Sequence, residues 1–434
     1  MDNKAIISLI VFTLSYFFIA IERVPRVYIT VFGATLLVLF KVFTPNEVAL
    51  YIDWDTIGFL FGTFMIVKII EDSGFFNYLA LFIARKLDYN PVKILIVFPA
   101  LSWLLSGFIS SITLLVFFAP LTYALSKILK FDPVPFIIAE ACLANIGGAG
   151  TLMGDPPNII LGSMFKLGFV DFFLHNFLLS LIAGIGAIFT FYLMNRKNLI
   201  EMKNKINKKE LLELSPHEAI EDKFMMRIGL FGLSATVILL LLRDFIEEFL
   251  PINISLCSLI PSFAILSIRG NYPKLKNILR EIDIETLIFF AGLFVIVGSL
   301  EKTELIQKLA NMLGQFAEKG FMMATVLFWG GAFSSALIDN VPEAISFGYL
   351  VKHLMPELKY SFTILIWASS LGLDIGGNFT PIGASANVVG YSFLENRGLK
   401  IGWGRWIKLS FIPTMVALSL CWLGLYGKYL IGFY

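Results

Sequence analysis

Residues 145–162 constrain the fold of this chain more than any other segment, because they interrupt an apolar run with helix-breaking residues. The segment NIGGAGTLMGDPPNIILG contains five glycines, two prolines, one Asp and two Asn. Glycine loosens the backbone, while Pro156 and Pro157 lack N–H donors and disfavour helix just before them. Broken backbone at membrane depth is tolerated only where protein or a water-filled cavity receives its polar groups. The break therefore predicts a binding site within the membrane.

A second copy of this segment lies 229 residues further along the chain, at residues 374–390. Residues 52–56 likewise match residues 282–286. We therefore expect a tandem duplication, with a first transmembrane repeat at 1–194, a charged cytoplasmic linker at 195–226 and a second repeat at 227–434. Paired interrupted segments indicate the substrate site of a transporter, whereas the alternative is that the glycines only ease helix packing. The identical pairs are Gly147 with Gly376, Gly148 with Gly377, Thr151 with Thr380, Gly154 with Gly383 and Asn158 with Asn387.

The composition is that of a multi-pass membrane protein. Of 434 residues, 57% are hydrophobic and only 15% are charged, which excludes a soluble globule and a disordered chain. We expect it to lie in the lipid bilayer of the cell (plasma) membrane. A net charge of +2 without a basic stripe indicates no nucleic-acid partner. Three isolated cysteines argue against disulfides or a metal site, and the absence of a P-loop argues against ATP binding by this chain.

The apolar runs predict an all-α polytopic fold of two inverted repeats. Each repeat is expected to hold five transmembrane helices and one re-entrant hairpin, with broken helices at the midplane. Two amphipathic pieces, at 75–87 and 304–316, are expected near the membrane faces. The hairpins are predicted at 92–125 and 321–354. The predicted spans are 5–21, 27–40, 56–70, 136–166 with its break, 172–194, 227–242, 251–268, 286–300, 361–393 with its break, and 409–427.

The basic residues predict the orientation of the chain in the membrane. Five crossings per repeat is an odd number, so the two repeats should run in opposite directions. With the 195–226 linker in the cytoplasm, 23 of the 34 Lys and Arg residues fall in inner segments and 10 in outer ones, while Lys68 lies within a span. Both termini are then expected outside. The linker itself is expected to be a solvated helix.

Ionisable residues inside a membrane are costly, so they are the first functional candidates. No Arg, Lys or His lies in or beside the breaks and hairpin tips, which predicts an acidic pocket suited to a cation, a proton or a neutral polyhydroxy species. Helix N-termini at the two breaks could still hold one carboxylate. The acidic candidates are Asp155 and Asp339 as ion or proton sites, and Glu140, Glu343 and Asp374 as candidate proton relays.

Each candidate also has a structural interpretation. Asp155 is a proton or cation site, or it forms an Asx-turn or helix cap at the break. Asp339 and Asn340 bind the substrate or cap the hairpin tip. The amides of Asn158 and Asn387 present oxygen to an ion or close the broken helix ends. Alcohols such as Thr151, Thr380, Ser110 and Ser111 supply ligands or hold helices together by packing.

The pattern GGxxTLxGDPPN at residues 147–158, its second copy at 376–387 and Asp339-Asn340 at a hairpin tip resemble the ion transporter superfamily. Its arsenical-pump membrane proteins, melanosomal P protein type, sodium/proton antiporters and citrate-type permeases are the most similar groups. The resemblance implies inverted repeats, elevator-like alternating access and a site between hairpin tips and broken helices. Ile109-Ser110-Ser111 departs from the LDN pattern of many arsenite permeases, and both tips lack the Ser-Asn-Thr signature of dicarboxylate carriers. The residues implied in the site are Ser110, Ser111, Thr113, Thr151, Gly154, Asn158, Asp339, Asn340, Thr380 and Asn387.

The leading hypothesis is a secondary active transporter, coupled to H⁺ or Na⁺ and without an organic cofactor. It would export a small inorganic ion or solute such as arsenite, or exchange sodium for protons. The alternative of the same fold is a citrate or dicarboxylate permease. A passive channel or membrane sensor fits paired midplane breaks less well, and no nucleophile and base pair indicates an enzyme. A homodimer is compatible with the resemblance, although nothing in the spacing indicates one.

Overall fold

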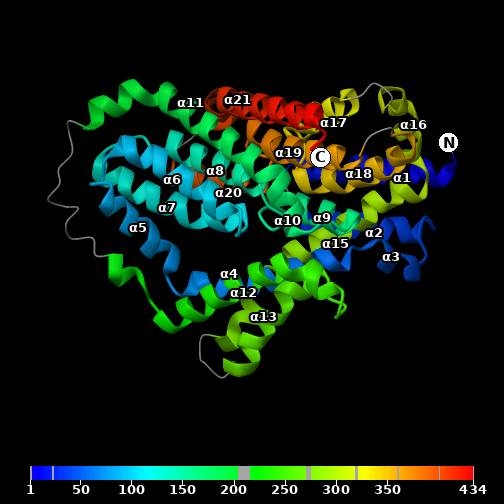
Figure 1. Cartoon of the computed structure of the whole chain (residues 1–434), viewed down its shortest axis with the longest axis horizontal. Coiled ribbons are helices and arrows are strands. Elements are labelled where there is room, and N and C mark those ends of the chain that lie inside the picture. Colours follow the sequence, from blue (N-terminus) through cyan, green and yellow to red (C-terminus); the bar gives the residue numbers. More distant parts are fainter. Residues whose placement is uncertain are drawn as a thin grey trace.

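The computed structural model describes residues 2–21, 24–203, 216–269, 275–317, 321–358, 361–399 and 401–433. Within these ranges every regular element is a helix (Figure 1). Much of the predicted charged linker, at 204–215, lies outside the described residues. The linker residues before it continue the preceding helix as far as Lys203.

The two halves of the chain contain equivalent helices in the same order, except that the described part of the first half has one additional short helix, α10. In both halves a hairpin of two helices is followed by a broken pair and a long final helix. The first half comprises α1 (Asn3–Ile21), α2 (Arg26–Leu39), α3 (Pro45–Tyr51), α4 (Trp54–Asp72), α5 (Phe75–Lys86), α6 (Pro91–Ser106), α7 (Ser111–Leu129), α8 (Val134–Gly148), α9 (Pro156–Phe165), α10 (Phe169–Phe172) and α11 (Leu178–Lys203). The second half comprises α12 (Lys223–Glu247), α13 (Ile254–Arg269), α14 (Ile278–Glu281), α15 (Ile284–Lys302), α16 (Leu305–Ala317), α17 (Met322–Ser335), α18 (Asn340–Leu354), α19 (Thr363–Gly376), α20 (Ser385–Asn396) and α21 (Gly402–Ile431).

The predicted breaks and hairpins are present, and the helix ends differ from the expected spans by a few residues. The helix expected at 172–194 begins earlier, at Phe169, and passes through a π-helical turn at Phe173–Phe177. The final helix extends beyond the expected 409–427 at both ends. These additions are polar or aromatic flanks, which an apolar window does not detect.

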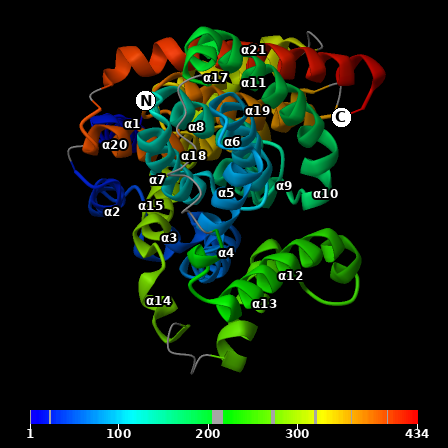
Figure 2. The ribbon, with the colours of Figure 1, turned by 90° about the vertical axis from the view of Figure 1, so that its left-hand side faces the viewer.

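The halves interlock rather than lie side by side. In the first half α4 packs against α12 and α13 of the second half, and α15 of the second half packs against α1 and α2 of the first. The hairpins cross in the same way, because α18 packs against α9 and α20 against α7. In Figures 1 and 2 the group of α4, α12 and α13 lies beside the larger body that contains α6, α8, α19 and α21.

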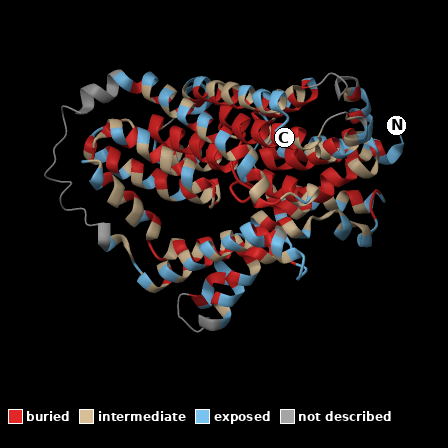
Figure 3. Ribbon diagram, in the orientation of Figure 1, coloured by how far each residue is buried: buried red, intermediate tan, exposed pale blue. Residues whose placement is uncertain are grey.

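The core of the molecule is formed by α8 and α19, the helices that precede the two breaks. Every residue of α8 is buried, and α19 is buried from Ile364 to Gly376 (Figure 3). Each helix approaches its hairpin partner through a glycine. A Cβ atom added at Gly147 would lie 2.0 Å from the Trp103 carbonyl oxygen of α6, and one at Gly376 would lie 2.3 Å from the Ala332 backbone of α17. Only glycine permits this backbone contact.

Among the described residues, five helices are long and apolar enough to cross a membrane, or six if the bent pair α3 and α4 is one span. Most arms of the hairpins and broken helices are shorter, with 15 residues in α8 and 14 in α19, as expected of segments that cross only part of the bilayer. The exception is the hairpin arm α7, which has 19 residues and is one of the five. Large apolar side chains face outward, including Phe32 and Phe231, which are 64% and 70% exposed. Such surfaces suit lipid rather than water.

Polar contacts between distant segments agree with the predicted orientation. Lys68, which lies within α4 near the inner end of the predicted span, pairs with Glu281 beside the inner loop 269–280. Lys302 pairs with Glu47 at a distance of 2.6 Å, and both segments were assigned to the outer side. Each contact therefore joins segments predicted on the same face. Two others do so as well: Arg405 with Asp132 inside, and His353 with Glu301 outside.

Candidate functional site

Four helix N-termini meet at one cavity in the interior of the protein. Two of them, α7 and α18, follow the hairpin tips, and the other two, α9 and α20, follow the breaks. The cavity has a volume of about 250 Å³. Because the N-terminal end of a helix carries partial positive charge, the four ends together favour negative groups at this point. The first turn of each helix contributes to the lining, through Ile112, Pro156, Asn340, Val341 and Ser385.

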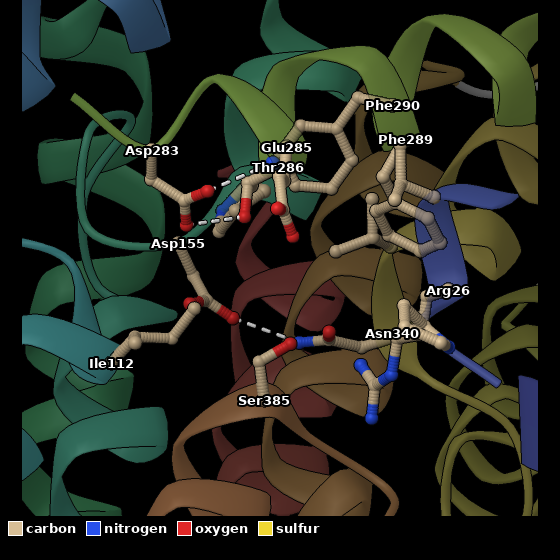
Figure 4. Close-up of a pocket in the computed structure, with 14 residues that line it drawn as sticks. Arg26, Ile112, Asp155, Asp283, Glu285, Thr286, Phe289, Phe290, Asn340 and Ser385 are labelled. Carbon is tan, nitrogen blue, oxygen red and sulfur yellow. Dashed lines mark hydrogen bonds between the residues drawn. The ribbon is translucent and has the colours of Figure 1, made fainter. Parts of the chain in front are cut away.

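The opposite wall of the cavity comes from α2 and α15. Phe289 and Phe290 of α15 supply apolar surface, while Asp283 and Glu285 supply carboxylates near its start (Figure 4). Arg26 of α2 lies on the same wall. Arg26, Asp283 and Glu285 all belong to segments predicted at the inner face, so the cavity faces the predicted cytoplasmic side.

A second, smaller cavity of about 30 Å³ adjoins the first. It lies between α4, the first hairpin tip and the first break. Ile112, Pro156 and Phe290 line both cavities. Three predicted site residues, Ser110, Thr113 and Gly154, line this second cavity.

Asp155 lies at the centre of the polar contacts. It occupies the position before α9, but its side chain makes no capping bond to that helix. Instead, the Ser111 hydroxyl donates to Asp155 Oδ1 at 3.0 Å, and Asn340 Nδ2 donates to Asp155 Oδ2 at 2.8 Å. The same Asn340 nitrogen donates to Asp374 Oδ1 at 3.2 Å. Four elements thus meet at one buried cluster, and the helix-cap interpretation of Asp155 is not what the structure shows.

Asp339 has both predicted features, a cap and a polar partner in the cavity. Its Oδ1 accepts from the Val341 N–H at 3.1 Å and so caps α18. Its Oδ2 accepts from the Ser385 hydroxyl at 3.0 Å and from Arg26 Nη1 at 2.7 Å. The Asp339 side chain is 1% exposed and that of Arg26 is 22% exposed. A cation therefore lies beside the hairpin tip, which corrects the expectation of a pocket without basic groups.

Asn158 and Asn387 brace the two breaks in the same way. Asn158 Nδ2 donates to the carbonyl oxygens of Gly148 and Thr151, at 3.0 and 2.9 Å. Asn387 Nδ2 donates to the equivalent carbonyls of the second break, both at 2.9 Å. These carbonyls lie at the open ends of broken helices, where the regular helical hydrogen bonds stop, and both amides donate to them. The structure places these two side chains in the scaffold of the site.

Thr151 and Thr380 fasten each break to its hairpin tip. The Thr151 hydroxyl donates to the Gly107 carbonyl, and the Thr380 hydroxyl donates to the Ala336 carbonyl. Both pairs span 44 residues of sequence. The two repeats therefore share this architecture at the level of single hydrogen bonds.

Two of the predicted relay carboxylates lie apart from the cavity wall. Glu140 of α8 accepts a hydrogen bond from Thr122 of α7 at 2.6 Å, and both are buried. Glu343 of α18 accepts from Ser334 of α17 at 2.9 Å, within the second hairpin. Each thus joins two helices of the same repeat. Asp374, the third, belongs to the cluster around Asp155.

Sequence reasoning missed several cavity residues, among them Arg26, Ser385 and Asp283. From the sequence, Arg26 belongs to the loop before the span expected at 27–40 and counts only as an inner positive charge. In the structure it is the first residue of α2. Ser385 occupies the position equivalent to Pro156, so it shows no identity between the copies. A signal was present for Asp283, because the match of residues 52–56 with 282–286 marks the start of a repeated helix.

Paired hairpins and broken helices around an intramembrane cavity, in a helical multi-pass protein, define a membrane transporter. Comparison with known proteins agrees. Residues 16–372 match the family model described as citrate transporter. An uncharacterized transporter of Mycobacterium tuberculosis is 30% identical over 98% of this chain and 99% of its own length. The chain therefore belongs to the citrate transporter family.

The comparisons also find a more distant similarity in sequence and a similarity in fold. The P protein of Homo sapiens is 26% identical over 87% of this chain and 54% of its own length. MtrF of Neisseria gonorrhoeae, described as one of a class of antimetabolite efflux pumps, superposes with a TM-score of 0.56 and 13% identity. That match covers 99% of this chain and 95% of MtrF, and it shows a shared fold. The predicted superfamily, with its P protein and citrate-type members, is confirmed.

Proposed function

We propose that this protein is an ion-coupled secondary transporter that moves a small inorganic ion or solute by alternating access through the cavity. Arsenite export and sodium/proton exchange are the leading forms of this activity. The coupling ion is H⁺ or Na⁺.

One observation carries this proposal: the cavity lies between two groups of helices, and each group contains helices of both repeats. The hairpin tips and breaks form one side, through Asp155, Asn340 and Ser385. The helices α2 and α15 form the other. A site on such a boundary changes its access when one group of helices moves past the other. The carboxylates of Asp155, Asp283 and Glu285 outnumber the Arg26 guanidinium, which suits a cationic or neutral solute.

A citrate or dicarboxylate permease is the second candidate, and Arg26 favours it. The guanidinium group binds carboxylates well, and four helix N-termini add partial positive charge around it. The family description as citrate transporter points the same way. A carboxylate substrate would compete with Asp339 for Arg26.

Flux into proteoliposomes tests the proposal and separates the candidates. Purified protein is reconstituted, and uptake or release of arsenite, sodium and labelled citrate is measured under imposed pH and sodium gradients. We expect saturable flux of one solute that depends on an ion gradient. Asp155→Asn and Asp339→Asn should abolish it, whereas Asp132→Asn, a surface carboxylate paired with Arg405, should leave it unchanged. Unchanged flux in both site variants would contradict the assignment, and flux that never saturates would indicate a channel.

A further inference from the structure

We propose that Asp155 and Asp374 form a single proton-binding site, in which the two carboxyl groups hold one proton between them and exchange it with the cavity. The role of this proton as the coupling ion rests on the proposed function. The binding of the proton to the two carboxyl groups does not depend on that function.

The side chain of Asn340 contacts both carboxyl groups. One amide nitrogen donates to Asp155 Oδ2 at 2.8 Å and to Asp374 Oδ1 at 3.2 Å, so both oxygens lie within hydrogen-bonding reach of the same atom. Like charges this close in a buried site do not both persist, and a shared proton removes one of them.

The buried carboxyl group of Asp374 makes too few hydrogen bonds to the described residues to be satisfied as an anion. Asp374 is fully buried, and its Oδ2 has no hydrogen-bond partner among the described residues. An ionised carboxylate can only accept hydrogen bonds, so it leaves this oxygen unsatisfied beside a second acceptor. A proton on either group turns one acceptor into a donor and allows an O–H···O bond between them.

The surrounding charges do not neutralise the pair by other means. Asp339 lies nearby on α18, and the Arg26 guanidinium donates to Asp339. Across the cavity α15 contributes Asp283 and Glu285, which are also acidic. The α7 side contributes the neutral hydroxyl of Ser111. The described groups near the pair are therefore neutral or acidic, except for Arg26, which is paired with Asp339.

The donors present favour a proton over a metal cation. The ligands that point at Asp155 are an amide N–H group and a hydroxyl, each of which donates to the carboxylate. Hard cations such as Na⁺ require several oxygen atoms directed at one point, and an amide nitrogen there would repel them. A proton needs only the two carboxyl oxygens.

The site has a route to water through Asp155. Asp155 lines the cavity and is 4% exposed, whereas Asp374 is 0% exposed and lies behind it. A proton from cavity water binds a carboxyl oxygen of the pair, and on release it returns to the same water. Asp155 is therefore at once a cavity wall and one half of the proton site, so proton and substrate binding share a residue.

Infrared spectroscopy of the full chain in detergent tests this proposal without requiring transport. The protonated carboxyl carbonyl band is followed between acidic and alkaline pH. We expect one component of this band to titrate in the wild type. Both Asp155→Asn and Asp374→Asn should shift its frequency and its titration midpoint, because each variant leaves the remaining buried carboxyl group without the partner that shares its proton. The buried Glu140 and Glu343 contribute other components of the band, which should be the same in the variants. Asp132→Asn should retain the band.

Folding is controlled by size-exclusion profile and thermal unfolding, with Asp374→Ala as a second variant should Asp374→Asn not be monodisperse. A band that titrates with unchanged frequency and midpoint in Asp155→Asn or in a folded Asp374 variant would overturn the shared site. So would the absence of a titrating band from the wild type. If wild-type proteoliposomes move none of the tested solutes, the proposed function fails while the band still decides the proton site.

Discussion

At the scale of the residue, the contact between Arg26 and Asp339 joins the wall of the cavity to a hairpin tip. Arg26 begins α2, and Asp339 precedes α18, so the pair crosses from one group of helices to another. Any movement of the hairpin past α2 must break it. When the ion pair breaks, the hydrogen bonds from Val341 and Ser385 keep the Asp339 side chain in place.

Arg26→Gln should destabilise the protein by about 2–3 kcal/mol. Removing one partner leaves a buried carboxylate unpaired, at a cost reduced by the partial exposure of Arg26. Denaturant unfolding in detergent measures this change. The double variant Arg26→Gln with Asp339→Asn should recover most of the loss, because no charge remains unpaired. A double variant as unstable as the single one would show that the ion pair is not the cause.

Asn387→Ala should lower the free energy of unfolding by about 1–3 kcal/mol or more. The change leaves the carbonyls of Gly377 and Thr380 buried without their side-chain donor. Asn396→Ala, at the exposed end of the same helix, is the matched control and should have almost no effect. Equal effects of the two changes would argue against a bracing role.

The residues that sequence comparison found and those it missed differ for a physical reason. Positions identical in both copies, such as Asn158 and Asn387, build the breaks, which both repeats need. Positions that line the cavity differ, because Asp155 corresponds to Ala384 and Ser110 to Asp339. Internal identity thus identified the architecture of the site, whereas its charge pattern required the folded chain.

At the scale of the element, each break depends on close helix packing as much as on proline. Gly376→Ala should cost about 1–3 kcal/mol or more, because the new methyl group meets the Ala332 backbone at 2.3 Å and backbone cannot move aside. Gly330→Ala on α17 is the control, since nothing lies within 4 Å of the added atom. Thermal unfolding should separate the two variants clearly. Equal unfolding midpoints would contradict the close approach of α17 and α19.

The elements themselves were largely predictable. Apolar runs and glycine or proline punctuation located both hairpins and both broken helices, since these depend on local sequence. Helix ends were predicted less well, because flanking residues continue a helix that has left the lipid. The first break is also easy to recognise, because it follows the apolar run of α8, which is entirely buried.

At the scale of the whole molecule, the exchange of helices between halves was not predictable. The packing of α4 against α13, and of α15 against α2, joins residues about 200 to 260 positions apart, and no local pattern specifies it. This exchange places Arg26 of the first half and Asp283 of the second on one wall of the cavity. The basic-residue count nevertheless predicted which loops share a face.

Alternating access requires that this cavity open in turn to the two sides of the membrane. Ser385→Cys, in a background with Cys142, Cys257 and Cys421 replaced by serine or alanine, places one thiol on the cavity wall. Its labelling by a membrane-impermeant reagent is measured from each side of oriented proteoliposomes, with the pH gradient imposed in either direction. We expect Cys at position 385 to be labelled from the cytoplasmic side in one condition and from the opposite side when the gradient is reversed. Labelling from one side only, whatever the gradient or added solute, would contradict it.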